Sequence, residues 1–180
     1  QVGAGGTTGQ LGTGNVTVNV AGTLAFNRSD AVSFGTLLSG AGALTQAGTG
    51  TLTISNVSSN LTGAVNVNSG TLVLPDTRLI NGAKTVAAGA TLEISSSIPF
   101  VTRWNNPGTI AGAGTILKTG TGVFGITGSM NFSGLLNVQN GRLMNDSTTG
   151  NWTNSTADVL IGSSGILDLR ANGITIDELN

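Results

Sequence analysis

Short stretches of the chain alternate apolar and polar residues with a period of two. In Val16–Phe26, the residues Val16, Val18 and Val20 alternate with polar residues before Gly22 interrupts the pattern. Such alternation is typical of β-strands that bury one face. The same strand–glycine–strand pattern returns in Ala64–Leu74, Thr85–Ile94, Leu135–Met144 and Val159–Leu169. No segment has a convincing 3.6-residue apolar period, so the chain is predicted to be all-β.

A longer repeat organises these strands. The stretch Gly40–Leu74 returns as Gly112–Met144, and the two copies keep a constant spacing apart from one deletion. We expect the repeated glycines to lie at corners, where the backbone needs a positive φ or a tight bend. The glycines that keep this spacing are Gly40, Gly42, Gly48, Gly50 and Gly70 in the first copy and Gly112, Gly114, Gly120, Gly122 and Gly141 in the second.

The repeat favours a parallel β-helix, which is a solenoid. Each strand pair is too short to bury its apolar face alone, whereas coiling successive units over one another stacks those faces into one core. Coils of roughly 20–24 residues are expected for such an architecture. Residues 1–180 are predicted to form one continuous body, with repeat copies at about 22–89, 90–164 and 165–180. A β-sandwich would not explain the long glycine pattern.

Composition narrows the functional classes. Charged residues make up 8% of the chain, the net charge is −1, and there are no cysteines and no histidines. Disulfides and thiolate metal sites are thereby excluded, and the missing basic excess argues against a nucleic-acid partner. The glycine-rich segments are followed by strands rather than by the helix that a phosphate loop requires. The sequence predicts no cofactor and no metal site.

The carboxylates do not suggest a catalytic pair. Glu93 and Asp168 hold matching repeat positions, so we expect them to face solvent about three coils, or ~14 Å, apart on one face. That separation is too large for the two carboxyls of a glycosidase. Asp158, Asp168 and Arg170 could serve a polysaccharide lyase, but the i, i+2 spacing of the last two favours an outward ion pair on one strand face. No catalytic residue is predicted.

Two places break the repeat and contain large aromatic residues. Trp104, next to Arg103, and Trp152 lie near polar turns, where an aromatic ring can stack on a sugar or anchor a partner. These three residues are the candidate ligand contacts, although the tryptophans could equally cover the side of the solenoid. Within the repeat, Asn66 and Asn137 match, and we expect outward Asn side chains of this kind to stack along the axis.

The repeat also resembles a known family. The pattern GAGxLTxxGxGTLTIS…LTGxVNVNxGTLVL in Gly40–Leu74 is similar to the passenger-associated repeats of autotransporters, the type V secretion family of Gram-negative bacteria. The resemblance implies a right-handed parallel β-helix displayed on the cell surface, outside the outer membrane. It also implies a partner, the translocator barrel of the same polypeptide. That barrel has no counterpart here, so the chain is expected to be a fragment of a longer passenger.

Three functions are compatible with these observations. The favoured one is a non-enzymatic stalk that supports export and display. The second is an adhesin module that binds host glycans or matrix proteins, and a carbohydrate-active β-helix enzyme is the least favoured. The tail Ile174–Asn180 resembles Ser33–Ser39, which directly precedes the first glycine module. A solenoid cut there would expose a strand edge, so self-association through the ends is predicted.

Overall fold

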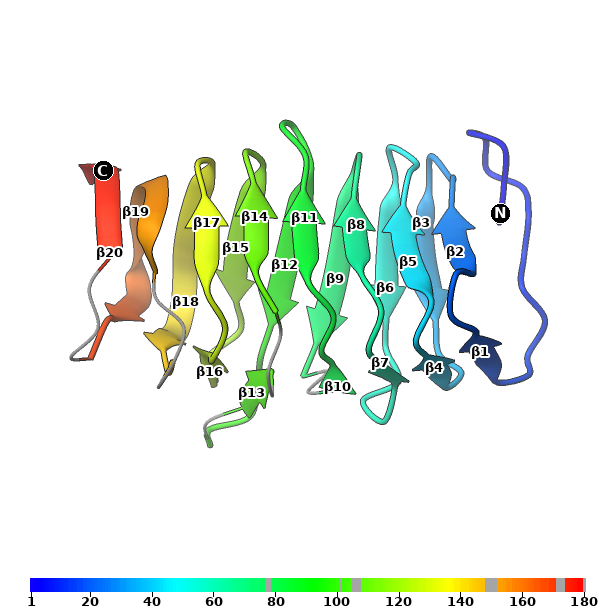
Figure 1. The fold of residues 1–180 in the computed structure, drawn as a ribbon, viewed down its shortest axis with the longest axis horizontal. Helices are drawn as coiled ribbons and strands as arrows, with labels where there is room; N and C mark the ends of the chain where they lie inside the picture. Colours follow the sequence, from blue (N-terminus) through cyan, green and yellow to red (C-terminus); the bar gives the residue numbers. More distant parts are fainter. Residues whose placement is uncertain (77–78, 101, 105–107, 148–151, 171–173, 180) are drawn as a thin grey trace.

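The chain folds as a stack of parallel β-coils. The computed structural model describes all residues except 77–78, 101, 105–107, 148–151, 171–173 and 180, with no side-chain description at 79, 102–104 and 174–179. The described part contains twenty strands and no helix, arranged as a β-solenoid of about seven turns (Figure 1). The prediction of an all-β parallel β-helix is confirmed. No helix in the described residues is long and apolar enough to cross a membrane.

Three parallel sheets form the faces of the coil. Sheet 1 contains β1 (Val16–Val18), β4 (Leu38–Gly40), β7 (Asn60–Leu61) and β10 (Leu79–Ile80). Sheet 2 contains β2 (Thr23–Phe26), β5 (Ala43–Gln46), β8 (Val65–Val67), β11 (Lys84–Val86), β14 (Ile110–Gly112) and β17 (Met130–Phe132). Sheet 3 begins with β3 (Ala31–Phe34), β6 (Thr51–Ile54), β9 (Thr71–Pro75), β12 (Thr91–Ser95) and β15 (Thr115–Thr119).

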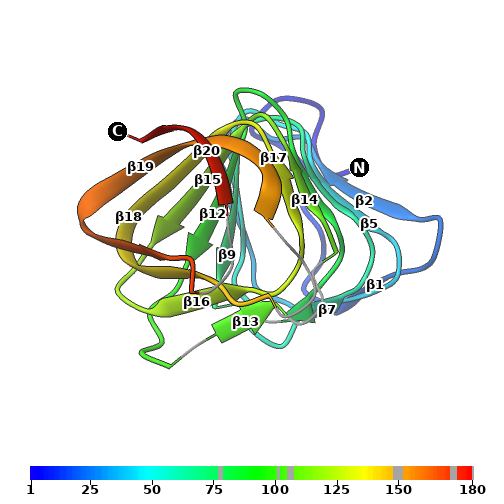
Figure 2. The same ribbon diagram turned by 60° about the vertical axis from the view of Figure 1, so that its left-hand side comes forward.

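The later coils have longer strands. Strand β18 (Leu135–Asn145) pairs with β15 through its first residues and with β16 (Val123–Ile126) through its last. Strand β13 (Thr102–Trp104) pairs with β16, and β19 (Trp152–Asp168) follows β18 before pairing with β20 (Ile174–Leu179). In Figure 1, β13 and β16 continue the lower edge that β1, β4, β7 and β10 begin. Figure 2 shows the coils wrapped around a common interior.

The register agrees with the expected coil length along sheet 3. Thr51 lies beside Thr71, Thr71 lies beside Thr91, and Thr91 lies beside Thr115. The coil that breaks the repeat is longer than these, because Lys84 in β11 has Ile110 in β14 as its next partner. Coil length therefore varies along the solenoid.

Inward columns of aliphatic residues form the core. One column of register partners along sheet 3 is at most 1% exposed, and its members are Leu52, Leu72, Leu92, Ile116, Leu136 and Val159. All of them belong to a single buried cluster that extends from Val2 to Val159. Burying one such side chain stabilises the fold by about 1.5–3 kcal/mol. The stacked columns, rather than any single coil, therefore hold the chain together.

The repeat glycines lie at corners or against the preceding coil. Five have a positive φ: Gly40, Gly70, Gly112, Gly120 and Gly141. The other five lie so close to the backbone of an earlier coil that a Cβ would come under 3.0 Å from a carbonyl oxygen: Gly42, Gly48, Gly50, Gly114 and Gly122. At Gly50 the obstructing atom is the Asp30 carbonyl oxygen. The glycine pattern thus marks places where a side chain would separate two coils.

The two copies of the module occupy different faces. Gly40 ends β4 in sheet 1, whereas its equivalent, Gly112, ends β14 in sheet 2. The register column of Gly112 runs back through Val86 and Val67 to Gln46, three coils earlier. Gly40 ends β4, and the chain then passes one more corner and strand β5 before it reaches Gln46. The shift between the two copies therefore spans three coils and one additional face.

This displacement corrects the expected asparagine stack. Asn66 has Thr45 and Thr85 as its register partners in sheet 2. Asn137 lies in sheet 3 beside Leu117 and Leu160. Equivalent asparagines do not stack, because the repeat is not a whole number of coils.

Candidate functional site

The candidate ligand contacts lie in two strands, β13 and β19. In β13, Arg103 and Trp104 lie beside Gly125 and Ile126 of β16, and their side chains lie outside the described residues. Trp152 is 0% exposed, belongs to the core, and donates a hydrogen bond from Nε1 to the Gly128 carbonyl oxygen at 3.3 Å. The indole of Trp152 therefore packs inside the solenoid and presents no face at the surface of the described structure.

An exposed aromatic residue lies in the long coil that breaks the repeat. Phe100 is 79% exposed and lies between β12 and β13, within the coil that separates the register partners Lys84 and Ile110. The sequence marks this segment as a break in the repeat. Phe100 thus lies two residues before β13, the strand that contains Arg103 and Trp104.

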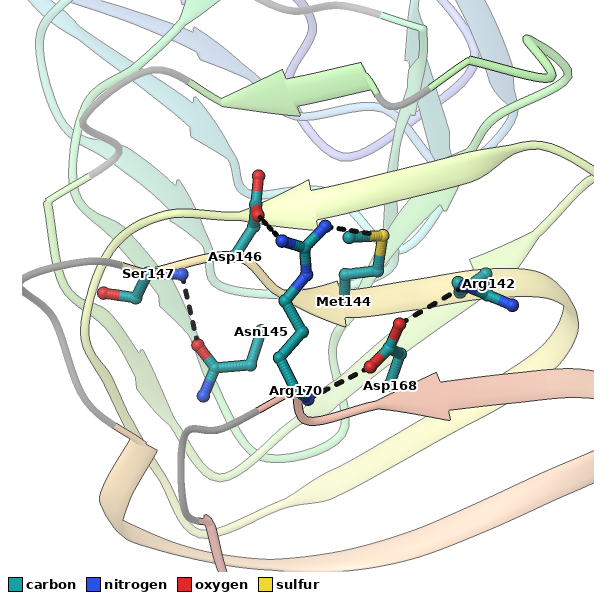
Figure 3. A network of polar contacts seen from close by, with 7 residues as sticks. All are labelled: Arg142, Met144, Asn145, Asp146, Ser147, Asp168 and Arg170. Carbon is teal, nitrogen blue, oxygen red and sulfur yellow. Dashed lines mark hydrogen bonds and ion pairs between the residues drawn. The ribbon is translucent and has the colours of Figure 1, made fainter.

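A polar network links the last coils (Figure 3). Arg142 Nη1 lies 3.3 Å from Asp168 Oδ2, and Arg170 Nη1 lies 3.2 Å from Asp146 Oδ1. The Arg170 backbone N–H donates to Asp168 Oδ1 at 3.0 Å, and Arg170 Nη2 lies 4.0 Å from Met144 Sδ. The residues come from the second half of β18, the end of β19 and the turn after each of them. Two arginines and two aspartates thereby fasten the end of β19 to β18.

The network corrects the expected ion pair. The sequence predicts that Asp168 and Arg170 pair through their side chains, but Arg170 has a φ of +54° and its guanidinium contacts Asp146 instead. Asp168 takes Arg142 as its cationic partner. Each of the two carboxylates thus has an arginine beside it, an arrangement typical of structural ion-pair networks.

The expected relation between Glu93 and Asp168 is wrong. Glu93 lies in sheet 3 beside Val73 and Leu117, and its Oε1 accepts a hydrogen bond of 2.6 Å from Thr119 Oγ1. Asp168 is the register partner of Met144, in the half of β18 that pairs with β16. The two acids lie in different columns, because the sequence between them again does not make a whole number of coils. Asp158 lies beside Leu135, near the other end of β19.

Three inward polar side chains cap main-chain carbonyls at the corners. Gln46, Lys84 and Lys118 are 2%, 0% and 0% exposed. Gln46 Nε2 donates to the carbonyls of Gly48 and Gly50 at 2.8 and 3.0 Å.

Both lysines bind carbonyls in the same way. Lys84 Nζ donates to the carbonyls of Ile80 and Gly82, each at 2.9 Å. Lys118 Nζ donates to those of Thr119, Gly120 and Asn140 at 2.6, 2.9 and 3.2 Å.

Burial alters the protonation of these two lysines. It lowers the pKa of Lys84 from 10.5 to about 7, because removal from water penalises the ammonium form. It also lowers the pKa of Lys118, to about 8, with Asp76 acting in the opposite direction. Both amines therefore gain or lose their proton near neutral pH.

The interior caps were missed in the sequence, although a signal was present. In ALTQ and TILKT, strict alternation places Gln46 with Leu44 and Lys118 with Ile116 on the inward face. Because Gln46 and Lys118 also match between the two copies of the repeat, a polar residue returns at the same place in both. A repeated polar residue on an apolar face indicates a buried hydrogen-bond donor.

A cavity of about 400 Å³ lies at the N-terminal end of the core. It is lined by Val2, Phe26, Arg28, residues 9–13 and residues 31–36, which include β3. The rings of Phe26 and Phe34 meet edge to face with their centroids 6.0 Å apart. Arg28 pairs with Asp30 at 2.7 Å, so this cation already has a partner.

The described residues contain no group of three or more Asp or Glu side chains placed to hold a metal ion. Comparison of the chain with family models, with curated proteins and with solved structures gives no significant match.

Proposed function

We propose that this chain is a non-enzymatic stalk segment of a bacterial surface protein, of the autotransporter passenger type that the Gly40–Leu74 repeat resembles. The observation that carries the proposal is the unbroken core, in which one column of sheet 3 continues from Leu52 to Val159. A body held together by stacked neighbours is rigid along its axis and can hold a distal domain away from a surface.

The partners and the location belong to the same proposal. The chain would be displayed outside the Gram-negative outer membrane, with the translocator barrel of the same polypeptide as its partner. The low content of charged residues, 8%, supports passage of the unfolded chain through a narrow pore. Each coil then folds on the preceding one, because the inward columns provide a template for the next strand.

A second candidate function is adhesion, and one observation favours it. Phe100 is 79% exposed in the coil that breaks the repeat, next to the strand that contains Arg103 and Trp104. Exposed aromatic residues such as Phe100 are enriched at binding sites. This corner would contact a host glycan or matrix protein.

A binding screen separates the two functions. The purified chain is tested against a glycan array and a panel of matrix proteins, in parallel with heat and protease resistance. The stalk proposal predicts no saturable binding, together with high resistance to both treatments. Saturable binding that is lost in Phe100→Ala but kept in Val57→Ala, a matched change at another exposed apolar residue (56% exposed), would overturn the stalk in favour of adhesion.

The enzyme alternative has its own test. The chain is incubated with acidic and neutral polysaccharides, and chain cleavage is followed by size-exclusion chromatography. We expect no cleavage. Cleavage that is lost in Asp168→Asn but retained in Asp30→Asn would contradict a non-enzymatic role.

A further inference from the structure

The first coil supplies a strand to sheet 2 but none to sheet 3. In sheet 2, Val2 forms a parallel bridge with Phe26 of β2. The chain then has to pass sheet 3 before it reaches β1 in sheet 1, so residues 3–15 hold the place of the missing strand. Within them, residues 9–13, here called the strap, line the cavity of about 400 Å³ together with β3. The strap therefore runs past β3 with a space between them.

The strap is anchored beyond both of its ends. Arg28 Nη1 donates a hydrogen bond to the Gly9 carbonyl oxygen, and the Leu37 backbone N–H donates to Asn15 Oδ1 at 3.3 Å. Between these anchors the backbone stands in the open, since a Cβ added at Gly12 would meet no atom within 4 Å. The repeat glycines of the later coils, by contrast, touch the backbone of the coil before them.

The edge of β3 on this side has unpaired main-chain groups. The carbonyls of Asp30 and Phe34 accept hydrogen bonds of 3.2 and 3.0 Å from N–H groups of the β6 coil. Successive residues of a strand direct their N–H and C=O groups to opposite edges, so those of Ala31 and Ser33 point toward the free edge. In the described structure no backbone hydrogen bond joins the strap to either residue. Such an edge is a template for another strand.

The inner wall of the cavity is apolar. Phe26 and Phe34 line it with rings that are 2% and 5% exposed, and Val2 lies beside them. Val32 also faces inward, because its register partner is a core leucine of β6. Thr36 Oγ1 is buried at the same cavity and has no hydrogen-bond partner in the described part of the chain. An apolar wall beside a row of main-chain donors and acceptors suits an extended peptide.

We infer that the space between β3 and the strap binds an extended peptide of about four residues, which adds as a strand to the free edge of β3. The four residues of β3 give this edge a length of ~13 Å. The bound segment is uncharged, with apolar side chains opposite Val32 and Phe34, as in the strand TLTI that pairs with the other edge of β3. Arg28 pairs with Asp30 at 2.7 Å, so this cation is already neutralised.

The strap and a folded second copy fit this space less well. The strap has the sequence GQLGT, and glycine weakens a strand. Its apolar residue, Leu11, already packs against the core. A second copy would have to bring a whole coil beneath a strap that is anchored on both sides, whereas a single extended segment needs only the width of one strand.

Amide hydrogen exchange, followed by NMR, tests the edge residue by residue. In the free chain at low concentration the amides of Ala31 and Ser33 should exchange rapidly, whereas those of Val32 and Phe34, which face β6, should be protected. The probe is the capped peptide GTLTIS, the sequence of Gly50–Ser55, which at saturation should slow exchange at Ala31 and Ser33 by at least about tenfold.

Two results of the exchange experiment would overturn the inference. Protection of Ala31 and Ser33 in the dilute free chain would show that the strap itself occupies the edge. Protection that grows with protein concentration, without peptide, would identify a second copy as the occupant.

A binding titration supplies the matched controls. Anisotropy of labelled GTLTIS should give saturable binding, and GTTLIS, which has the same composition without alternation, should bind at least about tenfold more weakly. Ser33→Pro removes an N–H from the free edge and should weaken GTLTIS binding at least about tenfold, whereas Ser33→Ala keeps that N–H and should change it less than about twofold.

The titration has clear contrary outcomes. No saturable binding of GTLTIS, equal binding of the two peptides, or equal effects of the two Ser33 substitutions would each overturn the inference. Circular dichroism checks that Ser33→Pro is folded. If it is not, the two peptides still decide the matter on the wild-type chain.

Discussion

The two copies of the glycine module, Gly40–Leu74 and Gly112–Met144, share a pattern but occupy different faces of the coil. The first begins in sheet 1 and the second in sheet 2. The glycines serve the same purposes in both copies, by turning the chain or by clearing space for the adjacent coil. The comparison shows that the pattern specifies a succession of corners and strands, whereas coil length determines where around the solenoid each corner falls.

The copies also differ in what surrounds them. The first lies in coils with separate short strands, whereas the second leads into β18 and β19, which have 11 and 17 residues. Beside β19 the core is less complete, since Ile161, the register partner of the buried Val138, is 38% exposed, and Leu167, the partner of the buried Leu143, is only partly buried. The Arg142–Asp168 and Arg170–Asp146 contacts fasten this part of the solenoid.

The largest effect is expected from equivalent core leucines. Leu72→Ala should cost about 4 kcal/mol of unfolding free energy, because its column is closed on both sides by Leu52 and Leu92. Leu143→Ala should cost about 1 kcal/mol less, since its column ends on the partly buried Leu167, where the structure can relax. Urea unfolding at pH 7.5 measures both. A larger loss for Leu143→Ala would contradict the difference between the copies.

The corner glycines test what the copies have in common. Gly50→Ala and Gly122→Ala should each cost about 3 kcal/mol, because each Cβ would meet a backbone carbonyl of the preceding coil. Gly14→Ala is the control, since open space surrounds that position, and its effect should stay within about 0.5 kcal/mol. Thermal or urea denaturation gives the comparison. Equal effects at all three positions would show that coil contact is not the reason for these glycines.

Exchanging the caps sharpens the comparison further. Gln46→Lys gives the first copy of the repeat the residue that the second copy has at the equivalent position, Lys118. It should lower the free energy of unfolding by about 2 kcal/mol at pH 7, where a buried ammonium is costly. The loss should shrink as the pH rises toward 10, because the amine of the folded chain is then neutral. Unfolding measured at pH 7 and 10 tests this sign. A loss that grows with pH would contradict it.

The smallest effects on the free energy of unfolding are expected at Asp168 and Glu93, which hold matching positions in the repeat. Asp168→Asn should cost at most about 1 kcal/mol, and the loss should diminish at about 1 M salt, since its partner Arg142 is partly exposed. Glu93→Gln should be less sensitive to salt, because Glu93 contacts the hydroxyl of Thr119. Denaturation at low and high salt distinguishes them, and an identical salt response would count against the different environments.

The sequence is sufficient to predict the strands, the corner glycines and the solenoid, because these depend on local alternation and on the repeat. It does not predict how the copies stack. The matching repeat positions suggest that Asn66 and Asn137, or Glu93 and Asp168, line up along the axis. The coils differ in length, however, and this difference moves the matched residues to separate columns.

The candidate site is harder to predict from the sequence than the fold is. Trp152 stands out in the sequence as a repeat-breaking aromatic, yet only the packing of the last coils shows that it is buried. The caps Gln46 and Lys118 could have been found from their alternation. One of their acceptors could not, because the Asn140 carbonyl that binds Lys118 belongs to the neighbouring coil.

The central claim is that equivalent residues of the two repeat copies are separated by three coils and one additional face of the solenoid. Disulfide trapping tests it directly, since the chain has no cysteine of its own. Thr85→Cys with Ala111→Cys joins register partners on β11 and β14, ~4.8 Å apart, and should crosslink under mild oxidation. Thr85→Cys with Asn131→Cys lies two coils apart and should not. If the shift between the two copies were instead three equal coils, Thr85→Cys with Thr109→Cys would crosslink faster than the first pair, and that result would contradict the account.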